Sequence, residues 1–342
     1  MNTSDISALS PADTVLQMFG QICSFRAVYV AAELGLADLL AAKPQNVAEL
    51  AATTGCDAPS LYRVMRALTQ IGFFTEDEEG GRFTSTPLGA ILQSDVPGSM
   101  RGLVRMMGAD WHWRSWEGIV ASVRSGKPAI DIVLGSSFYE FLSAHPSEAQ
   151  IFDQAMTSLS SVENAAISRA IELDGAEIVV DVGGGHGNLL IALLESHPGA
   201  RGILFDRPPA IDGARAAIRE SRIGDRCELI GGDFFVSIPS GGDVYLLKFI
   251  LHNWNDERAA AILRRCREAM TPGGRLLLLE QVVPRGNEPS PTKVLDLQMM
   301  VFLEGRERTV EEFRALLSQT GFALERVVST GTIVHIIEAV AR

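Results

Sequence analysis

Residues 177–188 read EIVVDVGGGHGN, an apolar strand that runs directly into a glycine-rich turn and then into a helix. Ile178, Val179 and Val180 are β-branched and uninterrupted, as expected for a strand buried on both faces of a parallel sheet. The glycines that follow allow a sharp turn and leave no side chain between the backbone and a ligand. Because the next helix starts at Asn188, its free N–H groups face that turn. The stretch predicts an α/β fold with a nucleotide-like ligand at the turn.

The positions of the glycines narrow the choice of ligand. A dinucleotide fingerprint has glycines at G-x-G-x-x-G. Gly183 and Gly185 fit its first two positions, whereas the third holds Asn188. Asp181 lies two residues before the first glycine and would repel a pyrophosphate. A cationic ligand without phosphates, such as S-adenosylmethionine (SAM), suits that carboxylate better. The glycine stretch alone leaves two interpretations open, a cofactor site and a plain tight turn.

Further candidate ligand-binding residues follow at the ends of the next three predicted strands. GILFD ends at Asp206, about twenty residues past the glycines, where an acidic residue can bind both ribose hydroxyls. CELIGGDFF ends in Asp233 and Phe234, which offer a carboxylate for an adenine amino group and an aromatic face for its ring. VYLLKFIL delivers Lys248 and then His252. Each residue alone reads as a turn residue, a cap or a solvated charge. Because ligands of open α/β sheets bind outside these strand ends, the set predicts a cofactor site.

Five motifs of the chain occur together in one known family: DVGGGHG, LFD, GGDFF, LKFILHNWND and GRERT. They resemble the motifs of plant-type small-molecule O-methyltransferases, which include caffeate-type enzymes and bacterial relatives acting on polyketides, phenazines and similar aromatic metabolites. The resemblance covers nearly the whole chain. It implies that His252 is the catalytic base, flanked by Glu280 of LLLLEQ and Glu307 of GRERT. It also implies that SAM contacts residues of the glycine turn and the strand ends, namely Gly183, Asp206, Asp233, Phe234 and Lys248.

The sequence departs from that family at two places. Asn253 in HNWND stands where many relatives have Asp. The segment LQMMVFLEGRERT lacks one residue that plant members have, so Glu307 is matched to the family less directly than Glu280.

Methyl transfer from SAM can also be argued from the chemistry of the side chains. The acceptor oxygen must lose its proton as it attacks, and a phenol has a pKa of about 10 whereas imidazole has about 6.5. Full proton transfer to His252 is therefore uphill by roughly 5 kcal/mol. Transfer that accompanies attack, together with a carboxylate partner, can offset this cost. Glu280, on the adjacent strand, is the candidate for holding the far ring nitrogen. The alternative role for His252 is a histidine at a helix start that bonds the backbone.

Apolar side chains in two segments are candidates for lining an acceptor pocket. Phe152 and Met156 lie four residues apart on a predicted helix and share a face. Core packing is the alternative, whereas equivalent positions of the resembled family line the acceptor cavity. The residue after HN and the segment before GRERT add Trp254, Met299, Met300 and Phe302. A pocket rich in Met and Phe suits a flat aromatic ligand.

The amino-terminal part has the pattern of a winged helix–turn–helix. NVAELAATTG and APSLYRVMRALTQIG predict two helices around a turn, and FFTEDEEGGRFTST predicts a hairpin. A DNA-binding regulator is therefore a second hypothesis. The charges oppose it, because the would-be recognition helix offers only Arg63 and Arg66 while the wing carries Glu76, Asp77, Glu78 and Glu79. The better interpretation is a dimerisation module whose apolar helices bury against a partner subunit.

Composition limits the remaining classes. The 342 residues predict a dimerisation domain at 1–97, a helical linker and acceptor-pocket region at 98–172 and a SAM-binding domain at 173–342. A net charge of −12 argues against nucleic acid or anionic membrane as a partner. The four cysteines lack CxxC spacing and indicate a reducing compartment. No signal peptide and no apolar run of membrane-spanning length are evident, so a cytoplasmic location is expected.

We therefore expect a Rossmann-like methyltransferase domain, a doubly wound sheet whose last strand is antiparallel, behind a mainly helical winged-helix domain. The expected protein is a homodimeric, metal-free SAM-dependent O-methyltransferase that releases S-adenosylhomocysteine and acts on a phenolic hydroxyl of a secondary metabolite, as in antibiotic biosynthesis. Two other enzymes remain as alternatives. One is a nicotinamide-dependent oxidoreductase, and the other is a protein of methyltransferase fold with altered chemistry.

Overall fold

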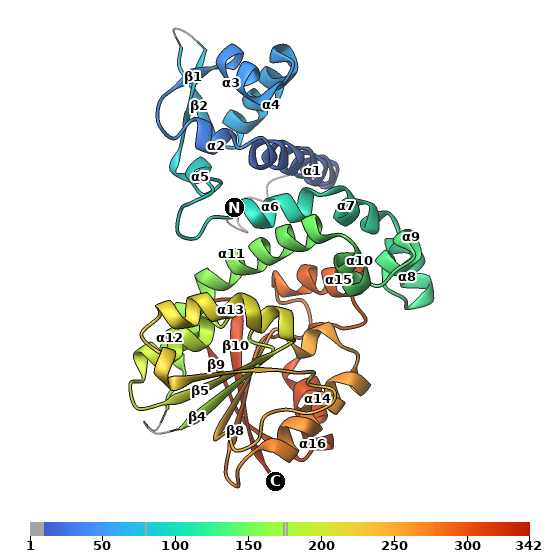
Figure 1. Cartoon of the computed structure of the whole chain (residues 1–342). Coiled ribbons are helices and arrows are strands. Elements are labelled where there is room, and N and C mark those ends of the chain that lie inside the picture. Colours follow the sequence, from blue (N-terminus) through green and yellow to red (C-terminus); the bar gives the residue numbers. More distant parts are fainter. Residues whose placement is uncertain (1–9, 79–80, 174, 176) are drawn as a thin grey trace. The chain divides into compact units, whose positions relative to one another are not determined.

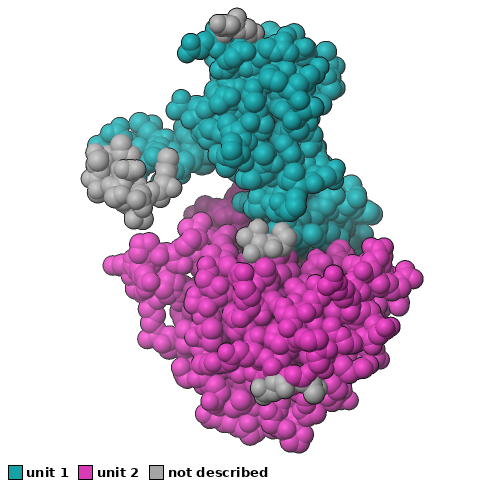
Figure 2. Space-filling view, turned by 90° about the vertical axis from the view of Figure 1, so that its left-hand side faces the viewer, with its two compact units in different colours: residues 1–113, 142–159 teal, residues 114–141, 160–342 magenta. Residues whose placement is uncertain are grey.

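The computed structural model describes residues 10–78, 81–173, 175 and 177–342. These residues form two compact units, shown in separate colours in Figure 2. Unit 1 comprises residues 1–113 and 142–159, and unit 2 comprises residues 114–141 and 160–342. The predicted three-part division at residues 97 and 172 stays a prediction.

Unit 1 contains the predicted helix–turn–helix and hairpin (Figure 1). Ser10 caps the first helix, and Asn46 and Asp57 cap the two helices of the helix–turn–helix through their side chains. Its short strands form an antiparallel sheet of order β1-β3-β2. Residue 79 of the acidic wing lies outside the described residues. The elements are α1 (Pro11–Glu33), α2 (Leu36–Leu39), β1 (Gln45–Asn46), α3 (Val47–Thr54), α4 (Ala58–Gln70), β2 (Phe74–Glu76), β3 (Arg82–Ser85), α5 (Pro87–Ala90) and α6 (Arg101–Gly108).

Helix α1 departs from the sequence expectation about membrane spans. Within the described part of the chain it is the one helix that is long and apolar enough to cross a membrane, by length and composition only. A core helix of a soluble protein passes the same test, so this is weak evidence. Only 22% of its most apolar window is buried. Large apolar side chains are more than half exposed on it, at Val15, Leu16, Met18, Phe19 and Ile22. The expectation that no apolar stretch reaches this length was therefore wrong.

Helices at the boundary between the two units run from one into the other. Helix α7 covers Asp110–Glu117, α10 covers Phe138–Ala144 and α11 covers Pro146–Ala170. Unit 2 also contains α8 (Ile119–Ser125), α9 (Ala129–Leu134) and α15 (Thr292–Phe302).

A seven-stranded sheet of order β6-β5-β4-β7-β8-β10-β9 forms the centre of unit 2 (Figure 1). Strands β4 to β8 of this sheet pair in parallel, and β10 is antiparallel to both of its neighbours, as predicted. Because the chain leaves β4 toward β5 and returns to its other side with β7, the strand order reverses at β4. Ligands of such sheets bind at this reversal. The strands are β4 (Ile178–Val182), β5 (Arg201–Asp206), β6 (Cys227–Gly231), β7 (Val244–Lys248), β8 (Arg275–Gln281), β9 (Phe322–Ser329) and β10 (Val334–Ala341).

Two apolar cores cover the two faces of this sheet. Helices α12 (Asn188–Ser196) and α13 (Pro208–Glu220), with the end of α11, pack on one face. Helices α14 (Asp256–Ala269) and α16 (Val310–Gln319) pack on the other. The turns η2 (Gly224–Arg226) and η3 (Leu251–Asn253) complete the unit. Alternate residues of β4 enter opposite cores, since Val179 belongs to one and Val180 to the other. The sheet is thus buried on both faces, and its carboxyl edge carries the candidate site.

Two strands end earlier than their apolar sequences predict. Strand β6 stops at Gly231, and the Asp233 carboxylate accepts a hydrogen bond from the Phe235 N–H at 2.8 Å, so Asp233 and Phe234 lie in a turn. Strand β7 stops at Lys248 because Phe249 has a left-handed φ of 54°. Among the residues that the structure describes, Phe249 is the single non-glycine with a positive φ.

Candidate active site

The glycine turn between β4 and α12 has the backbone that its sequence predicts. Gly183, Gly185 and Gly187 have φ values of 74°, 58° and 77°, a region that other residues rarely adopt. A Cβ on Gly183 would lie 2.5 Å from Ile250 Cδ1, whereas a Cβ on Gly185 would meet nothing within 4 Å. The turn is therefore tight on its sheet side at Gly183 and open at Gly185.

Asp181 lies beneath this turn rather than beside it. Its side chain is 1% exposed, and a Cβ on Gly184 would lie 2.5 Å from its Oδ2. Neither carboxylate oxygen has a hydrogen-bond partner within the described residues. Burial, with Asp206 nearby, raises the pKa of Asp181 to about 7. A buried acceptor of this kind favours a ligand that brings positive charge or donors to the turn.

The other predicted cofactor residues border the same turn. Asp206 accepts hydrogen bonds from the backbone N–H of Gly185 at 2.8 Å and of Arg207 at 2.6 Å. Phe234 Cε1 lies 3.7 Å from the position that a Cβ on Gly183 would take. The structure therefore gathers the aspartate and the aromatic ring around one loop. Asp233 caps the turn that follows β6, and this is the structural role that the sequence analysis gave as the alternative to cofactor binding.

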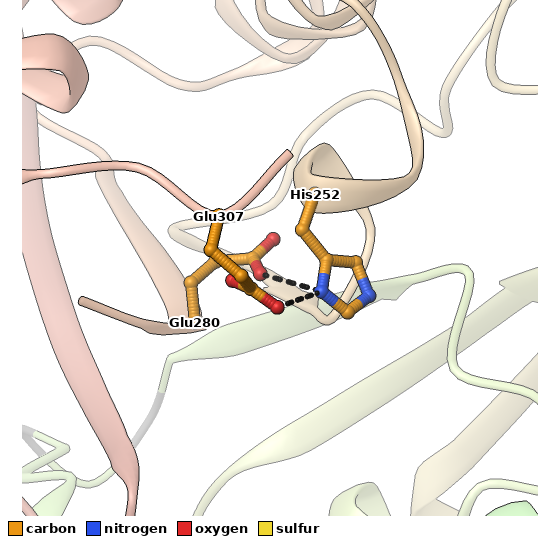
Figure 3. A group of neighbouring side chains, drawn as sticks. All are labelled: His252, Glu280 and Glu307. Carbon is orange, nitrogen blue, oxygen red and sulfur yellow. Dashed lines mark hydrogen bonds and ion pairs between the residues drawn. The ribbon is translucent and has the colours of Figure 1, made fainter. Parts of the chain in front are cut away.

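His252 lies in η3, directly after β7, and both predicted glutamates face its ring. Glu307 Oε1 is 2.9 Å from Nδ1 and within hydrogen-bond distance, whereas Glu280 Oε2 is 3.9 Å away. Figure 3 shows that both carboxylates approach the same ring nitrogen, while Nε2 is turned away from them. Burial alone would lower the pKa of His252, but the two carboxylates outweigh burial and raise it. The arrangement leaves Nε2 as the nitrogen that can accept a proton.

These distances favour Glu307 over Glu280 as the carboxylate that hydrogen-bonds the ring, and the catalytic roles predicted for both stay predictions. Glu280 Oε1 instead accepts the Leu251 N–H at 2.8 Å, so this carboxylate fixes the turn that carries His252. Burial raises the pKa of Glu280 to about 7, although His252 opposes this shift. The segment before GRERT is one residue shorter than in plant members, but Glu307 still reaches the His252 ring. The Asp296 carboxylate holds its backbone by accepting the Glu307 N–H at 2.7 Å.

Arg308, which the sequence reasoning missed, holds the backbone on both sides of His252. The guanidinium is fully buried and donates to the carbonyl oxygens of Leu251 and Trp254, each at 2.9 Å. It also donates twice to Asp256 Oδ1, at 3.1 and 2.8 Å. A Cβ on Gly305 would collide with the His252 carbonyl oxygen. The GRERT motif therefore packs directly on the segment that carries the histidine.

Phe249 contacts one face of the His252 ring. Its side chain stacks on the imidazole of His252 with 5.3 Å between ring centroids and 21° between planes. Its carbonyl oxygen accepts a hydrogen bond at 2.9 Å from the side-chain amide of Asn253. An Asp at position 253 could not donate this bond when ionised. Phe249 thus combines this ring contact with a left-handed backbone, a strained conformation for a residue other than glycine.

Comparisons with known proteins identify the family. Residues 116–323 match the family profile of the O-methyltransferase domain, and residues 16–95 match the O-methyltransferase dimerisation domain. The chain belongs to the O-methyltransferase family. It is 43% identical to the phenazine O-methyltransferase PhzM of Lysobacter antibioticus over 97% of each chain.

Solved structures agree with this assignment. The crystal structure of LaPhzM matches with a TM-score of 0.92 at 42% identity, over 98% of this chain and 100% of that one. The structure of NcsB1, an O-methyltransferase from neocarzinostatin biosynthesis solved with SAM and 2-hydroxy-5-methyl naphthoic acid, matches with a TM-score of 0.79 at 33% identity, over 92% and 95% of the two chains. The protein is thus a SAM-dependent methyltransferase, and the nicotinamide alternative falls away.

The carboxyl edge of the sheet in this methyltransferase fits SAM. The turn is open at Gly185, the buried Asp181 has two free acceptor oxygens within the described residues, and Asp206 lies alongside. Lys248, the last residue of β7, is held by Glu163 and Asn164 of α11. Carboxylates outnumber ammonium groups here, which suits a ligand with a net positive charge.

The predicted acceptor-pocket residues fall into two groups. In unit 2, Trp254 stacks on Tyr139 with centroids 6.1 Å apart, and Phe302 packs edge-on against Phe138 at 6.1 Å. Trp254 Nε1 is buried and makes no hydrogen bond to the described residues. Met299 and Met300 are half-buried on α15. Phe152 and Met156 lie on the part of α11 that belongs to unit 1, so their role stays a prediction.

Proposed function

We propose that this methyltransferase transfers the methyl group of SAM to a phenolic hydroxyl of a small aromatic secondary metabolite, with His252 as general base. The observation that carries the proposal is the hydrogen bond between His252 Nδ1 and Glu307 Oε1 at 2.9 Å. It leaves Nε2 directed away from both carboxylates (Figure 3). A histidine placed in this way can take a proton at Nε2 while a carboxylate stabilises the resulting charge at Nδ1.

The residues of the site have separate roles in this proposal. Bound SAM supplies an electrophilic methyl group on a sulfonium. Gly183, Gly185, Asp206, Asp233 and Phe234 would hold its nucleoside, while Asp181 and Lys248 lie at the same strand ends. Glu307 stabilises the imidazolium, and Glu280 fixes the turn through the Leu251 N–H. The uphill proton transfer of roughly 5 kcal/mol is reduced because the carboxylates raise the pKa of His252.

An aromatic acceptor is supported by the side chains around the histidine and by the names of relatives. The indole of Trp254 has ring contacts with Tyr139, Phe234 and Phe235 in the same unit. Similar proteins are named for phenazine O-methylation or were solved with a hydroxynaphthoic acid. We propose that Trp254, Met299, Met300 and Phe302 of unit 2 contact the acceptor.

A homodimer is the assembly that we propose. The exposed apolar side chains of α1 lie in the segment matched by the dimerisation domain. Burying them against a partner explains their exposure in a single chain. Phe19→Glu should shift the protein toward monomers in light scattering, whereas Val236→Glu, at an equally exposed apolar residue of unit 2, should not. A wild-type protein that is monodisperse and monomeric would refute the dimer.

The decisive test of the function is methyl transfer to a monohydroxyphenazine. His252→Ala should lower kcat by about 10²- to 10⁴-fold, the usual contribution of general base catalysis. His197→Ala, at the carboxyl end of α12, is the matched control and should keep the wild-type rate. Full activity of His252→Ala would refute the assignment of the base.

One specific observation supports a second candidate. The aclacinomycin 10-hydroxylase RdmB of Streptomyces purpurascens is 35% identical over 94% of this chain and 87% of its own length. The altered-chemistry alternative therefore stays open, and the product mass separates a gained methyl group from a gained oxygen.

A further inference from the structure

A buried ion pair at the carboxyl edge of the sheet has no part in the proton transfer described above. Lys248 Nζ lies 3.2 Å from Glu163 Oε2, and the two side chains are 10% and 7% exposed. Lys248 Nζ also donates to Asn164 Oδ1 at 2.8 Å. Taking two charges out of water costs free energy that their attraction rarely exceeds, so stability alone is a poor reason for this pair.

The pair lies beside the glycine turn. Strands β4 and β7 are paired in parallel with Asp181 opposite Leu246, so Lys248 projects from the same edge as the turn. Asp181 and Lys248 are close enough to influence each other electrostatically. With Glu163 included, this corner holds two buried carboxylates and one ammonium group.

The amino-acid end of SAM carries charges that complement the charges of this corner. Adenine and ribose carry no charge, whereas the amino-acid end carries an ammonium and a carboxylate beyond the sulfonium. An ionised carboxylate has about four acceptor positions. Glu163 Oε2 is ion-paired with Lys248 but accepts no hydrogen bond from the described residues. The remaining positions can accept the donors of a second ammonium group.

We propose that Glu163 binds the α-ammonium group of SAM and that Lys248 holds the Glu163 carboxylate in place for this contact. The inference rests on the proposed function, since it concerns the same cofactor site. Glu163 is then a specificity-determining residue, because it distinguishes a ligand with an amino-acid end from an adenine nucleoside without one.

The position of Glu163 on its helix supports the same role. Glu163 lies four residues before Ile167 on α11, and Ile167 is fully buried, so both residues share the face of the helix that packs on the sheet. A carboxylate on a buried helical face needs a partner. Neither the family motifs nor the strand ends include this position.

Calorimetric binding of two ligands tests the assignment without any catalytic readout. S-adenosylhomocysteine has the amino-acid end, and 5′-methylthioadenosine lacks it. Glu163→Gln should weaken binding of S-adenosylhomocysteine roughly 10- to 100-fold and change that of 5′-methylthioadenosine less than about twofold. Glu177→Gln is the matched control, because Glu177 pairs with Arg275 at 3.0 Å and is also mostly buried. It should change neither affinity.

The outcomes separate the two proposals. Equal weakening of both ligands by Glu163→Gln, or no weakening of either, would overturn the role of Glu163 and leave the cofactor site intact. Wild-type protein that binds neither ligand would overturn the proposed function and this inference with it. If Glu163→Gln does not fold because Lys248 is left unpaired, the double variant Glu163→Gln/Lys248→Met removes both charges. It should then bind the two ligands with similar affinity.

Discussion

Replacing Glu307 by Gln tests the geometry around the base most directly. The amide keeps the size of the side chain and an acceptor oxygen for the Nδ1 proton, but it removes the charge 2.9 Å from Nδ1. A hydrogen bond to a charged group is worth about 1.5–3 kcal/mol, against about 0.5–1.5 for a neutral pair. Losing the difference of about 1–2 kcal/mol in the transition state lowers kcat about 5- to 30-fold. The effect should be on kcat, because the ground-state histidine is neutral.

The pH profile supplies an independent reading of the same change. The base works in its neutral form, so activity falls as the pH drops through the raised pKa of His252. Glu307→Gln removes one of the carboxylates that raise this pKa, and the acid limb should therefore move to lower pH. The measurement is methyl transfer to a monohydroxyphenazine at saturating SAM from about pH 5 to 9.

Glu280→Gln is the matched comparison for Glu307→Gln. The Gln amide keeps an oxygen that can accept the Leu251 N–H. The Glu280 carboxylate lies 3.9 Å from His252 Nδ1 and makes no hydrogen bond to the ring. Its kcat should therefore fall less than that of Glu307→Gln, and its binding of S-adenosylhomocysteine should be unchanged. A larger loss in Glu280→Gln than in Glu307→Gln, or an acid limb that moves to higher pH in Glu307→Gln, would refute the reasoning.

Two further predictions concern the scaffold around the base. Gly183→Ala should lower the melting temperature more than Gly185→Ala, because both have positive φ but only the Cβ at 183 meets a neighbour within 4 Å; equal melting temperatures would contradict this. Arg308→Met should cost about 3 kcal/mol or more of unfolding free energy in urea, since it leaves two carbonyl oxygens unsatisfied. Arg306→Met, which removes two partly exposed ion pairs, to Asp256 and Glu312, should cost less than about 1 kcal/mol, and a similar loss in both variants would disprove the role of Arg308.

The parts of the fold that could be predicted are those encoded locally. The glycine turn follows from Gly183 to Gly187, and the antiparallel tail follows from two alternating apolar runs before and after Gly331. Strand ends were less predictable. VYLLKFIL is apolar throughout, and nothing in its composition shows that Phe249 adopts a left-handed backbone and ends β7 at Lys248.

The candidate site also has features that the sequence predicts and features that it does not. His252 was predictable from its place after a strand, but the choice between Glu280 and Glu307 depends on distances of 3.9 and 2.9 Å that no spacing encodes. Glu307 reaches the ring from a different segment, which the Asp296 carboxylate holds through the Glu307 N–H. Long-range contacts of this kind link residues that are far apart in the chain, so local patterns cannot rank them.

The adjacent residues Glu307 and Arg308 connect the GRERT motif to the turn that carries His252. Glu307 holds the ring, while Arg308 holds the carbonyl oxygens of Leu251 and Trp254 on either side of it. A shift of this dipeptide would therefore move the imidazole and its backbone together, which preserves the ring orientation relative to Glu307. The imidazole is thus positioned by long-range contacts more than by its own short turn. Substitutions in GRERT should consequently act on catalysis even though the motif lies more than fifty residues from His252 in the chain.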